Sequence, residues 1–107
     1  MEQEIRILPK ELKRKLDNKE NIFLLDVRTL KEQEISKLEN SYLIPITELN
    51  SRLNEIPKDK EIIVYCHHGI RSMEATKILR EKGFNAKCLI GGIDVWSRFI
   101  DSSIKQY

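Results

Sequence analysis

The stretch from Ile62 to Arg71 constrains this chain most, because it joins an apolar run to a short polar loop that carries a cysteine. Residues 62–65 are β-branched or aromatic, which indicates a buried strand. Cys66 follows, four residues separate it from Arg71, and an amphipathic segment begins at once. We therefore expect a strand, a tight loop and the start of a helix, with a thiol and a guanidinium at opposite ends of the loop.

This loop has features that favour a reactive thiolate at Cys66. A sulfur at a helix N-terminus lies at the positive end of the helix dipole, near backbone N–H groups that lack partners within the helix. Arg71 adds a permanent positive charge with a planar fork of donors. Gly69 lets the loop curl without a Cβ clash. The sequence predicts a cradle that holds a thiolate, a persulfide or a small anion.

The length of the loop separates two chemistries. Cysteine phosphatases wrap a tetrahedral phosphate in a Cys-x5-Arg loop, whereas here only four residues lie between Cys66 and Arg71. A tighter ring of N–H groups suits a single sulfur atom better than a phosphoryl group. The loop therefore favours sulfur transfer, and a cysteine-dependent phosphatase or arsenate reductase is the less favoured alternative.

Short apolar runs alternate with short amphipathic segments along the rest of the chain. Strands are predicted at residues 4–7, 22–25, 42–44, 62–65 and 86–90, and helices at residues 9–17, 30–38, 47–56, 72–82 and 93–99. Thr47 is the expected N-cap of the helix at 47–56. This alternation is typical of an α/β fold with three layers, in which about five short strands form a parallel sheet between helices on both faces.

Polar residues follow two of the predicted strands. Asp26 and Arg28 come directly after the run at 22–25, and the cysteine loop comes after the run at 62–65. Right-handed crossovers bring the carboxyl ends of parallel strands to one edge of a sheet, where such folds place their sites. We expect Asp26 and Arg28 to support the cysteine loop at this shared edge.

Composition limits the classes of protein to consider. A chain of 107 residues fits a single domain, residues 1–107. The net charge of +2 comes from 19 basic and 17 acidic residues that are interspersed, which excludes a nucleic-acid partner. The apolar runs are far shorter than the roughly 18 residues of a membrane span, and residues 1–4 do not resemble a signal peptide. We therefore expect a cytoplasmic protein with no membrane partner.

The two cysteines, Cys66 and Cys88, are expected to stay reduced. They do not form the CxxC spacing of a zinc ribbon or a thioredoxin-like pair. Cys88 lies within a predicted strand and is interpreted as a core residue. We expect no metal site at His67 and His68, because adjacent residues in a tight loop should point in different directions.

Four motifs taken together resemble the single-domain rhodanese family of sulfurtransferases. They are Leu25–Arg28, Ile44–Pro45, Val64–Ser72 and Gly91–Trp96, and the similarity covers roughly residues 3–100. The chain departs from the family at residues 36–41, where a Gly-His-Ile-Pro-Gly-like segment is usual. The segment 101–107 is similar to the end of rhodanese domains fused to enzymes that activate molybdopterin and thiamine sulfur carriers.

The resemblance implies a persulfide mechanism without a cofactor. Cys66 would take the sulfane sulfur of thiosulfate or a persulfide donor and pass it to a nucleophilic acceptor, with ping-pong kinetics. Arg71 would orient the anionic donor and brace the loop, and backbone N–H groups would stabilise the persulfide. The implied substrate-binding residues are His67, His68, Gly69, Ile70, Arg71 and Ser72.

Two alternatives to free sulfur transfer remain open. The domain could carry a persulfide to, or bind, a sulfur-carrier protein while turning over free thiosulfate poorly. It could also be an inactive binding domain, which is disfavoured because Cys66 and Arg71 are both present.

Overall fold

Five parallel strands form the centre of this computed structural model, which describes residues 4–107. The strands lie in the order β1-β5-β4-β2-β3. Their bounds are β1 (Arg6–Ile7), β2 (Ile22–Asp26), β3 (Tyr42–Leu43), β4 (Glu61–Tyr65) and β5 (Ala86–Leu89). The run at 62–65 occupies the middle of the sheet, where its side chains are buried on both faces.

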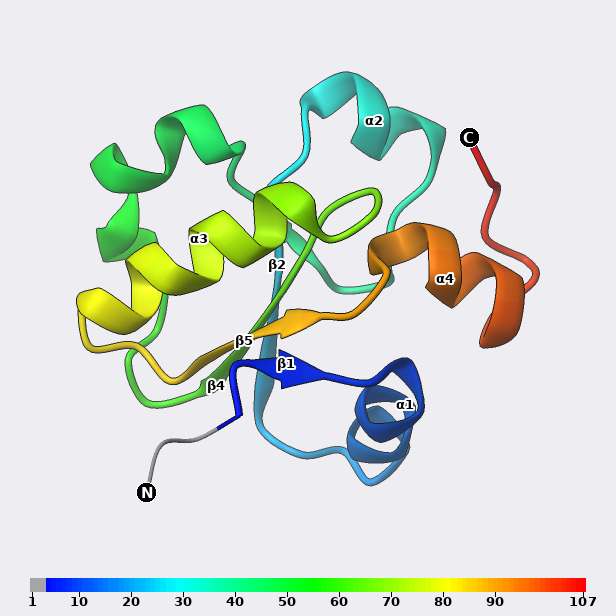
Figure 1. Cartoon of the computed structure of the whole chain (residues 1–107), viewed down its shortest axis with the longest axis horizontal. Coiled ribbons are helices and arrows are strands. Elements are labelled where there is room, and N and C mark those ends of the chain that lie inside the picture. The colour runs from blue at the N-terminus through cyan, green and yellow to red at the C-terminus, as the bar shows by residue number, and fades with distance from the viewer. Residues whose placement is uncertain (1–3) are drawn as a thin grey trace.

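Helices cover both faces of the sheet (Figure 1). On one side lie α1 (Pro9–Asp17) and α4 (Gly92–Phe99), and on the other lie α3 (Ile70–Glu81) and the two 3-10 helices η1 (Ile46–Ser51) and η2 (Leu53–Glu55). Alternate residues of β4 serve the two cores: Tyr65 packs with Trp96 of α4, and Val64 packs with Leu79 of α3. The three-layer α/β fold is therefore confirmed.

The segment expected as a helix at 47–56 is instead the pair of 3-10 helices η1 and η2. Pro45, and not Thr47, precedes the first of them. Ile46 donates its N–H to Val27 O (3.1 Å), which ties the start of the segment to the end of β2. Within η1 the Ser51 hydroxyl bonds the Glu48 carbonyl (2.9 Å), and this competition with the backbone disfavours a regular α-helix.

Helix α2 (Leu30–Ile35) is shorter than the expected span of 30–38. Ser36 is fully extended, and its carbonyl accepts a hydrogen bond from Arg28 Nη2 (2.7 Å). Leu38 N donates to the Tyr65 hydroxyl (3.2 Å) and Leu38 is buried in the core. These two bonds hold residues after Ile35 against the sheet edge and end the helix. No helix within residues 4–107 has the length and apolar character that crossing a membrane requires.

The cysteine loop leaves β4 at the carboxyl edge of the sheet and is fastened there by α4. Asp26 and Tyr65 are register partners at the ends of β2 and β4, so the segments that follow these strands emerge side by side, as expected. Ile93 N donates to Cys66 O (2.9 Å) and Asp94 N donates to His67 O (3.0 Å). These N–H groups belong to the first turn of α4, where backbone N–H groups have no acceptor within the helix.

Gly92 makes this attachment sterically feasible. A Cβ at Gly92 would lie 2.5 Å from the carbonyl oxygens of both Cys66 and His67, and φ there is +60°. Only a residue without a side chain allows the backbone of α4 to come this close to the loop.

We predict that Gly92→Ala lowers the free energy of unfolding by about 3 kcal/mol, because it adds both a backbone clash and a left-handed conformation. Gly83→Ala is the matched control, since φ at Gly83 is +90° but the nearest atom to an added Cβ is Lys58 Nζ at 3.5 Å. This control should cost only about 1 kcal/mol. Urea unfolding measures both, and equal costs would contradict the role of the close contact.

Candidate active site

The sulfur of Cys66 is buried and surrounded by hydrogen-bond donors. Only 1% of the residue is exposed. Its Sγ accepts N–H bonds from Gly69 (3.1 Å) and Ser72 (3.3 Å). Ser72 is the third residue of α3, so its N–H is one of those left free at a helix start. Gly69 is the N-cap, and its φ of +109° turns the loop back over the sulfur.

The Ser72 hydroxyl lies between two sulfurs. Ser72 Oγ is 3.3 Å from Cys66 Sγ and 3.2 Å from Cys88 Sγ. All three residues are buried, and both cysteines are free thiols. Burial raises the pKa of the Cys88 thiol. Cys88 is therefore a core residue, as expected, but it also contacts the site through Ser72.

Arg71 is held by a carboxylate from a different element. Its Nη1 and Nη2 donate to Glu32 Oε1 (2.7 Å) and Oε2 (2.8 Å), which is a bidentate pair. Arg71, above all, holds the pKa of Glu32 well below its ordinary value, and the pairing in turn raises the pKa of Arg71. Arg71 is thus placed to brace the loop through Glu32, and its expected role in orienting an anionic donor stays a prediction.

Glu32 is a site residue that the reading of the sequence missed. It is fixed by a capping box at the start of α2, in which Glu32 N donates to Thr29 Oγ1 (3.3 Å) and Thr29 N donates to Glu32 Oε1 (3.2 Å). The pattern Thr29-x-x-Glu32 is visible in the sequence and could have located the helix start. Nothing in the sequence shows that the same carboxylate reaches Arg71, 39 residues away.

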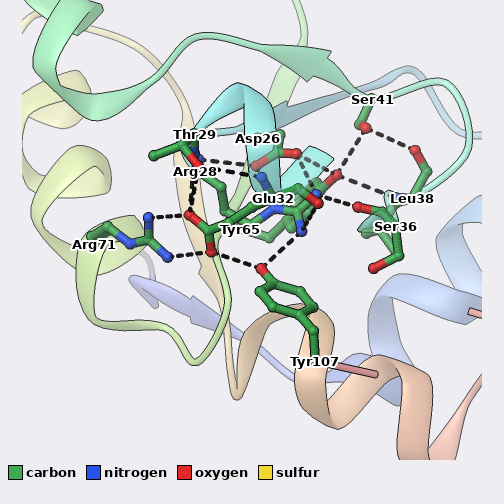
Figure 2. Close-up of polar contacts among 10 residues, drawn as sticks. All are labelled: Asp26, Arg28, Thr29, Glu32, Ser36, Leu38, Ser41, Tyr65, Arg71 and Tyr107. Carbon is green, nitrogen blue, oxygen red and sulfur yellow. Dashed lines mark hydrogen bonds and ion pairs between the residues drawn. The ribbon is translucent and has the colours of Figure 1, made fainter. Parts of the chain in front are cut away.

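Asp26 and Arg28 form a buried ion pair behind this carboxylate. Arg28 donates from Nε to Asp26 Oδ1 (2.9 Å) and from Nη2 to Asp26 Oδ2 (2.7 Å), and neither side chain is exposed. Arg28 Nη1 donates to the Tyr107 hydroxyl (2.9 Å), and this hydroxyl in turn donates to Glu32 Oε2 (2.7 Å). Figure 2 shows this chain of contacts from Asp26 to Arg71.

Tyr107 gives the segment 101–107 a defined place at the site. Its ring stacks on His67, with centroids 3.8 Å apart and planes 7° from parallel. Burial, above all, raises the pKa of Tyr107 to about 12, so the phenol keeps the proton that it donates to Glu32. The sequence carries no signal for this contact, because a polar tail can lie anywhere on a surface.

The segment at 36–41, where the chain departs from the rhodanese pattern, has its own means of turning. Asn40 adopts a left-handed conformation with φ of +65°, which Asn tolerates well. Ser41 Oγ donates to Leu38 O (2.7 Å) and accepts from the Tyr65 hydroxyl (2.8 Å). The same hydroxyl lies 3.1 Å from Asp26 Oδ2, so this turn connects to the buried ion pair (Figure 2).

His67, His68 and Ile70 surround the mouth of the loop. His67 is half-buried under Tyr107, and its Nε2 is buried without a hydrogen-bond partner among the described residues. His68 is exposed and its Nδ1 lies 3.8 Å from Asp94 Oδ2. Ile70 is 83% exposed, although it lies four residues from the buried Cys66.

The two histidine rings lie against each other, contrary to the expectation that they point apart. Their centroids are 3.9 Å apart with planes tilted by 35°. Together with Asp94 they form the one group within residues 4–107 that could hold a metal ion, with ligand atoms within 4.8 Å of one another. Tyr107 stacks on His67 as well. Stacked faces make ring packing the better-supported role, since coordination requires ring edges to converge on one point.

An apolar groove of about 620 Å³ runs beside the cysteine loop. Ile70 and Met73 of α3 line one side, and Cys88, Leu89 and Ile90 at the end of β5 line the other. Glu32, which faces Arg71, is not among the residues that line this groove. The site thus has one polar flank closed by paired charges and one apolar flank that is open.

A model of the rhodanese-like domain family matches residues 8–99, which include every element from α1 to α4. The chain belongs to the rhodanese-like domain family. A sulfurtransferase of Allochromatium vinosum is 33% identical over 88 residues, covering 81% of this rhodanese-like chain and 82% of that protein. The adenylyltransferase and sulfurtransferase MOCS3 of Arabidopsis thaliana is 36% identical over 121 residues, covering 97% of this chain but only 26% of that protein.

A solved structure with a related domain is the NAD-dependent persulfide reductase of A. fulgidus. It is 44% identical with a TM-score of 0.70, and the match covers 87% of this chain and 16% of that one. The rhodanese-like chain thus spans about a quarter or less of the length of several of the larger proteins that it matches.

We predict that Glu32→Gln lowers the free energy of unfolding by about 1–2 kcal/mol at pH 7, because it breaks the pair with Arg71. The pKa of Glu32 is lowered on folding from its ordinary 4.5, so its contribution is complete above that pH and is lost as the pH falls through the lower folded value. The difference from wild type should therefore shrink in strong acid. Urea unfolding at pH 7 and pH 3 measures it, with the exposed Glu34→Gln on α2 as control, and a difference that grows in acid would contradict the pairing.

Proposed function

We propose that this chain is a sulfurtransferase that carries sulfane sulfur as a persulfide on Cys66. The observation that carries the proposal is the pair of N–H bonds from Gly69 and Ser72 to a single buried sulfur at the start of α3. Such donors stabilise a negative charge on sulfur in the thiolate and in the persulfide alike. Relatives of similar length named as sulfurtransferases support the same assignment.

The first half-reaction loads the sulfur. The Cys66 thiolate attacks the outer sulfur of thiosulfate or of a persulfide, the S–S bond of the donor breaks, and sulfite or a thiolate leaves with the bonding electrons. A persulfide adds one S–S bond of about 2 Å to the side chain. The terminal sulfur then extends from the buried position of Cys66 toward the mouth formed by His67, His68 and Ile70.

The second half-reaction delivers the sulfur. A nucleophilic acceptor such as cyanide or a thiolate attacks the terminal sulfur, the S–S bond to Cys66 Sγ breaks, and the thiolate returns to its cradle. The two half-reactions share one covalent intermediate and give ping-pong kinetics. Arg71 braces the loop through Glu32, while its Nε and positive charge remain available to attract an anionic donor.

The loop geometry supports sulfur over phosphate. Only four residues separate Cys66 from Arg71, and the N–H groups of Gly69 and Ser72 both point at the Cys66 sulfur, at 3.1 and 3.3 Å. A phosphatase must also surround three phosphoryl oxygens with donors, and Arg71, the cation that would do this, already pairs both terminal nitrogens with Glu32.

A protein acceptor is the second candidate, and the open flank of the site favours it. Ile70 is 83% exposed at the crown of the loop, and the groove beside it is lined by Met73, Leu89 and Ile90. An exposed apolar patch next to a reactive group is typical of a surface that meets another protein. Sulfur transfer to a carrier protein would use the same Cys66 chemistry with a larger acceptor.

We predict that incubation with thiosulfate adds one sulfur atom to the chain and that cyanide removes it. Intact-mass spectrometry detects the adduct, and peptide mapping should place it on Cys66, with the buried Cys88 as the internal control thiol. Cys66→Ala should gain no sulfur. A wild-type chain that stays unmodified with thiosulfate and with an alkyl persulfide would rule out the proposed function.

The same preparation separates sulfur transfer from phosphate chemistry. The wild-type chain should release no product from an aryl phosphate, because the loop lacks the extra residue and the free guanidinium that a phosphoryl group needs. Aryl phosphate hydrolysis that disappears in Cys66→Ala, without persulfide formation, would reverse the assignment in favour of a phosphatase.

A further inference from the structure

Cys88 contacts the nucleophile through a single hydroxyl, and the mechanism above leaves this contact unused. Val64 and Cys88 are register partners on β4 and β5, which brings Cys88 near Cys66, two residues farther along the chain. Ser72 Oγ lies 3.2 Å from Cys88 Sγ and 3.3 Å from Cys66 Sγ. Ser72 is fully buried, so water does not compete for its hydroxyl.

The proton count fixes the direction of these bonds in the reactive state. A serine hydroxyl has one proton to donate and lone pairs that accept. A Cys66 thiolate has no proton, so Ser72 must donate to it, and the Ser72 oxygen can then accept only from its other neighbour. Cys88 is 2% exposed, and burial raises the pKa of its thiol, which keeps the S–H available.

The surroundings of Cys88 favour this bond over others. Two other acceptors near its sulfur, the carbonyls of Gly69 and Leu89, are farther away, at 3.7 and 3.8 Å. The Ser72 backbone is fixed as well, because Thr76 Oγ1 donates to Ser72 O (2.6 Å). The backbone of Ser72 is therefore held in place, and rotation of its hydroxyl is the smallest response to a change at Cys66.

We propose that Cys88 is a positioning residue for the Cys66 nucleophile. Its S–H donates to Ser72 Oγ and so turns the Ser72 proton toward the Cys66 sulfur whenever that sulfur is anionic. When Cys66 is a neutral thiol, the Ser72 proton turns toward Cys88 Sγ, and the Cys88 S–H turns to a carbonyl. The inference rests on the proposed function for its catalytic meaning, but the arrangement of the three side chains is independent of the sulfur donor.

Other charged and titratable groups around the two sulfurs stay the same in the test. They are Arg71 of α3 and Arg6 of β1, which act on Cys66 and Cys88 respectively, together with His67 and His68 of the loop and Asp94 of α4. A substitution at Cys88 alters none of these groups. A change in the alkylation rate of Cys66 therefore reports on the Ser72 hydroxyl between the two thiols.

The test is the pH dependence of Cys66 alkylation by iodoacetamide, resolved by peptide mass spectrometry in the full chain. Cys88→Ala removes the S–H that donates to Ser72 Oγ. The pH midpoint, at which the alkylation rate of Cys66 is half-maximal, should therefore rise, and the alkylation rate at pH 7 should fall about threefold. Cys88→Ser supplies a stronger donor of nearly the same shape, so the midpoint should stay at or below that of wild type. A midpoint unmoved in Cys88→Ala, or raised equally by both substitutions, would overturn the proposal.

Two further measurements test whether Cys88 acts through Ser72 and whether the variants are folded. In a chain that already carries Ser72→Ala, Cys88→Ala should not slow Cys66 alkylation further, because the hydroxyl that links the two sulfurs is already absent. If Cys88→Ala slows alkylation there as much as in the wild-type chain, the proposal is overturned. Thermal unfolding confirms that the compared variants are folded. Alkylation does not require sulfur transfer, so failure of wild type to form a persulfide would contradict only the proposed function.

Discussion

A buried sulfur that accepts two backbone N–H bonds is the feature on which the carboxyl edge of this sheet depends. Cys66 directly follows β4 and is itself buried, where a polar group without partners would be costly. The groups that meet this sulfur are the N–H groups of Gly69 and Ser72 at the start of α3 and the Ser72 hydroxyl. The contacts that hold the first turn of α3 therefore also hold the donors around this sulfur.

Support for that first turn comes from two directions. On one side α4 fastens the carbonyls of Cys66 and His67 through its own free N–H groups. On the other side Glu32 fixes Arg71, and Tyr107 and Arg28 connect Glu32 to the buried Asp26. Backbone bonds therefore hold the start of the loop at Cys66 and His67, and side-chain contacts hold its end at Arg71.

Local patterns in the sequence predicted the parts of the structure that depend on local causes. The apolar runs located β2, β4 and β5, Pro9 located the start of α1, and the spacing between Cys66 and Arg71 described the loop. The prediction failed at 47–56, where Pro45 and a tie to Val27 replaced an α-helix with 3-10 turns. Glu32, Tyr107 and the second contact of Cys88 could not be predicted, because each joins segments whose proximity only the folded chain creates.

Stacking of Tyr107 on His67 has a consequence for the direction of approach to the site. The ring, the tail behind it and the Glu32–Arg71 pair together close the flank of the loop that faces α2. The flank beside Ile70 and the end of β5 stays open and apolar. Access to Cys66 is therefore one-sided, and under the proposed function the sulfur donor and the acceptor would use the same face in turn.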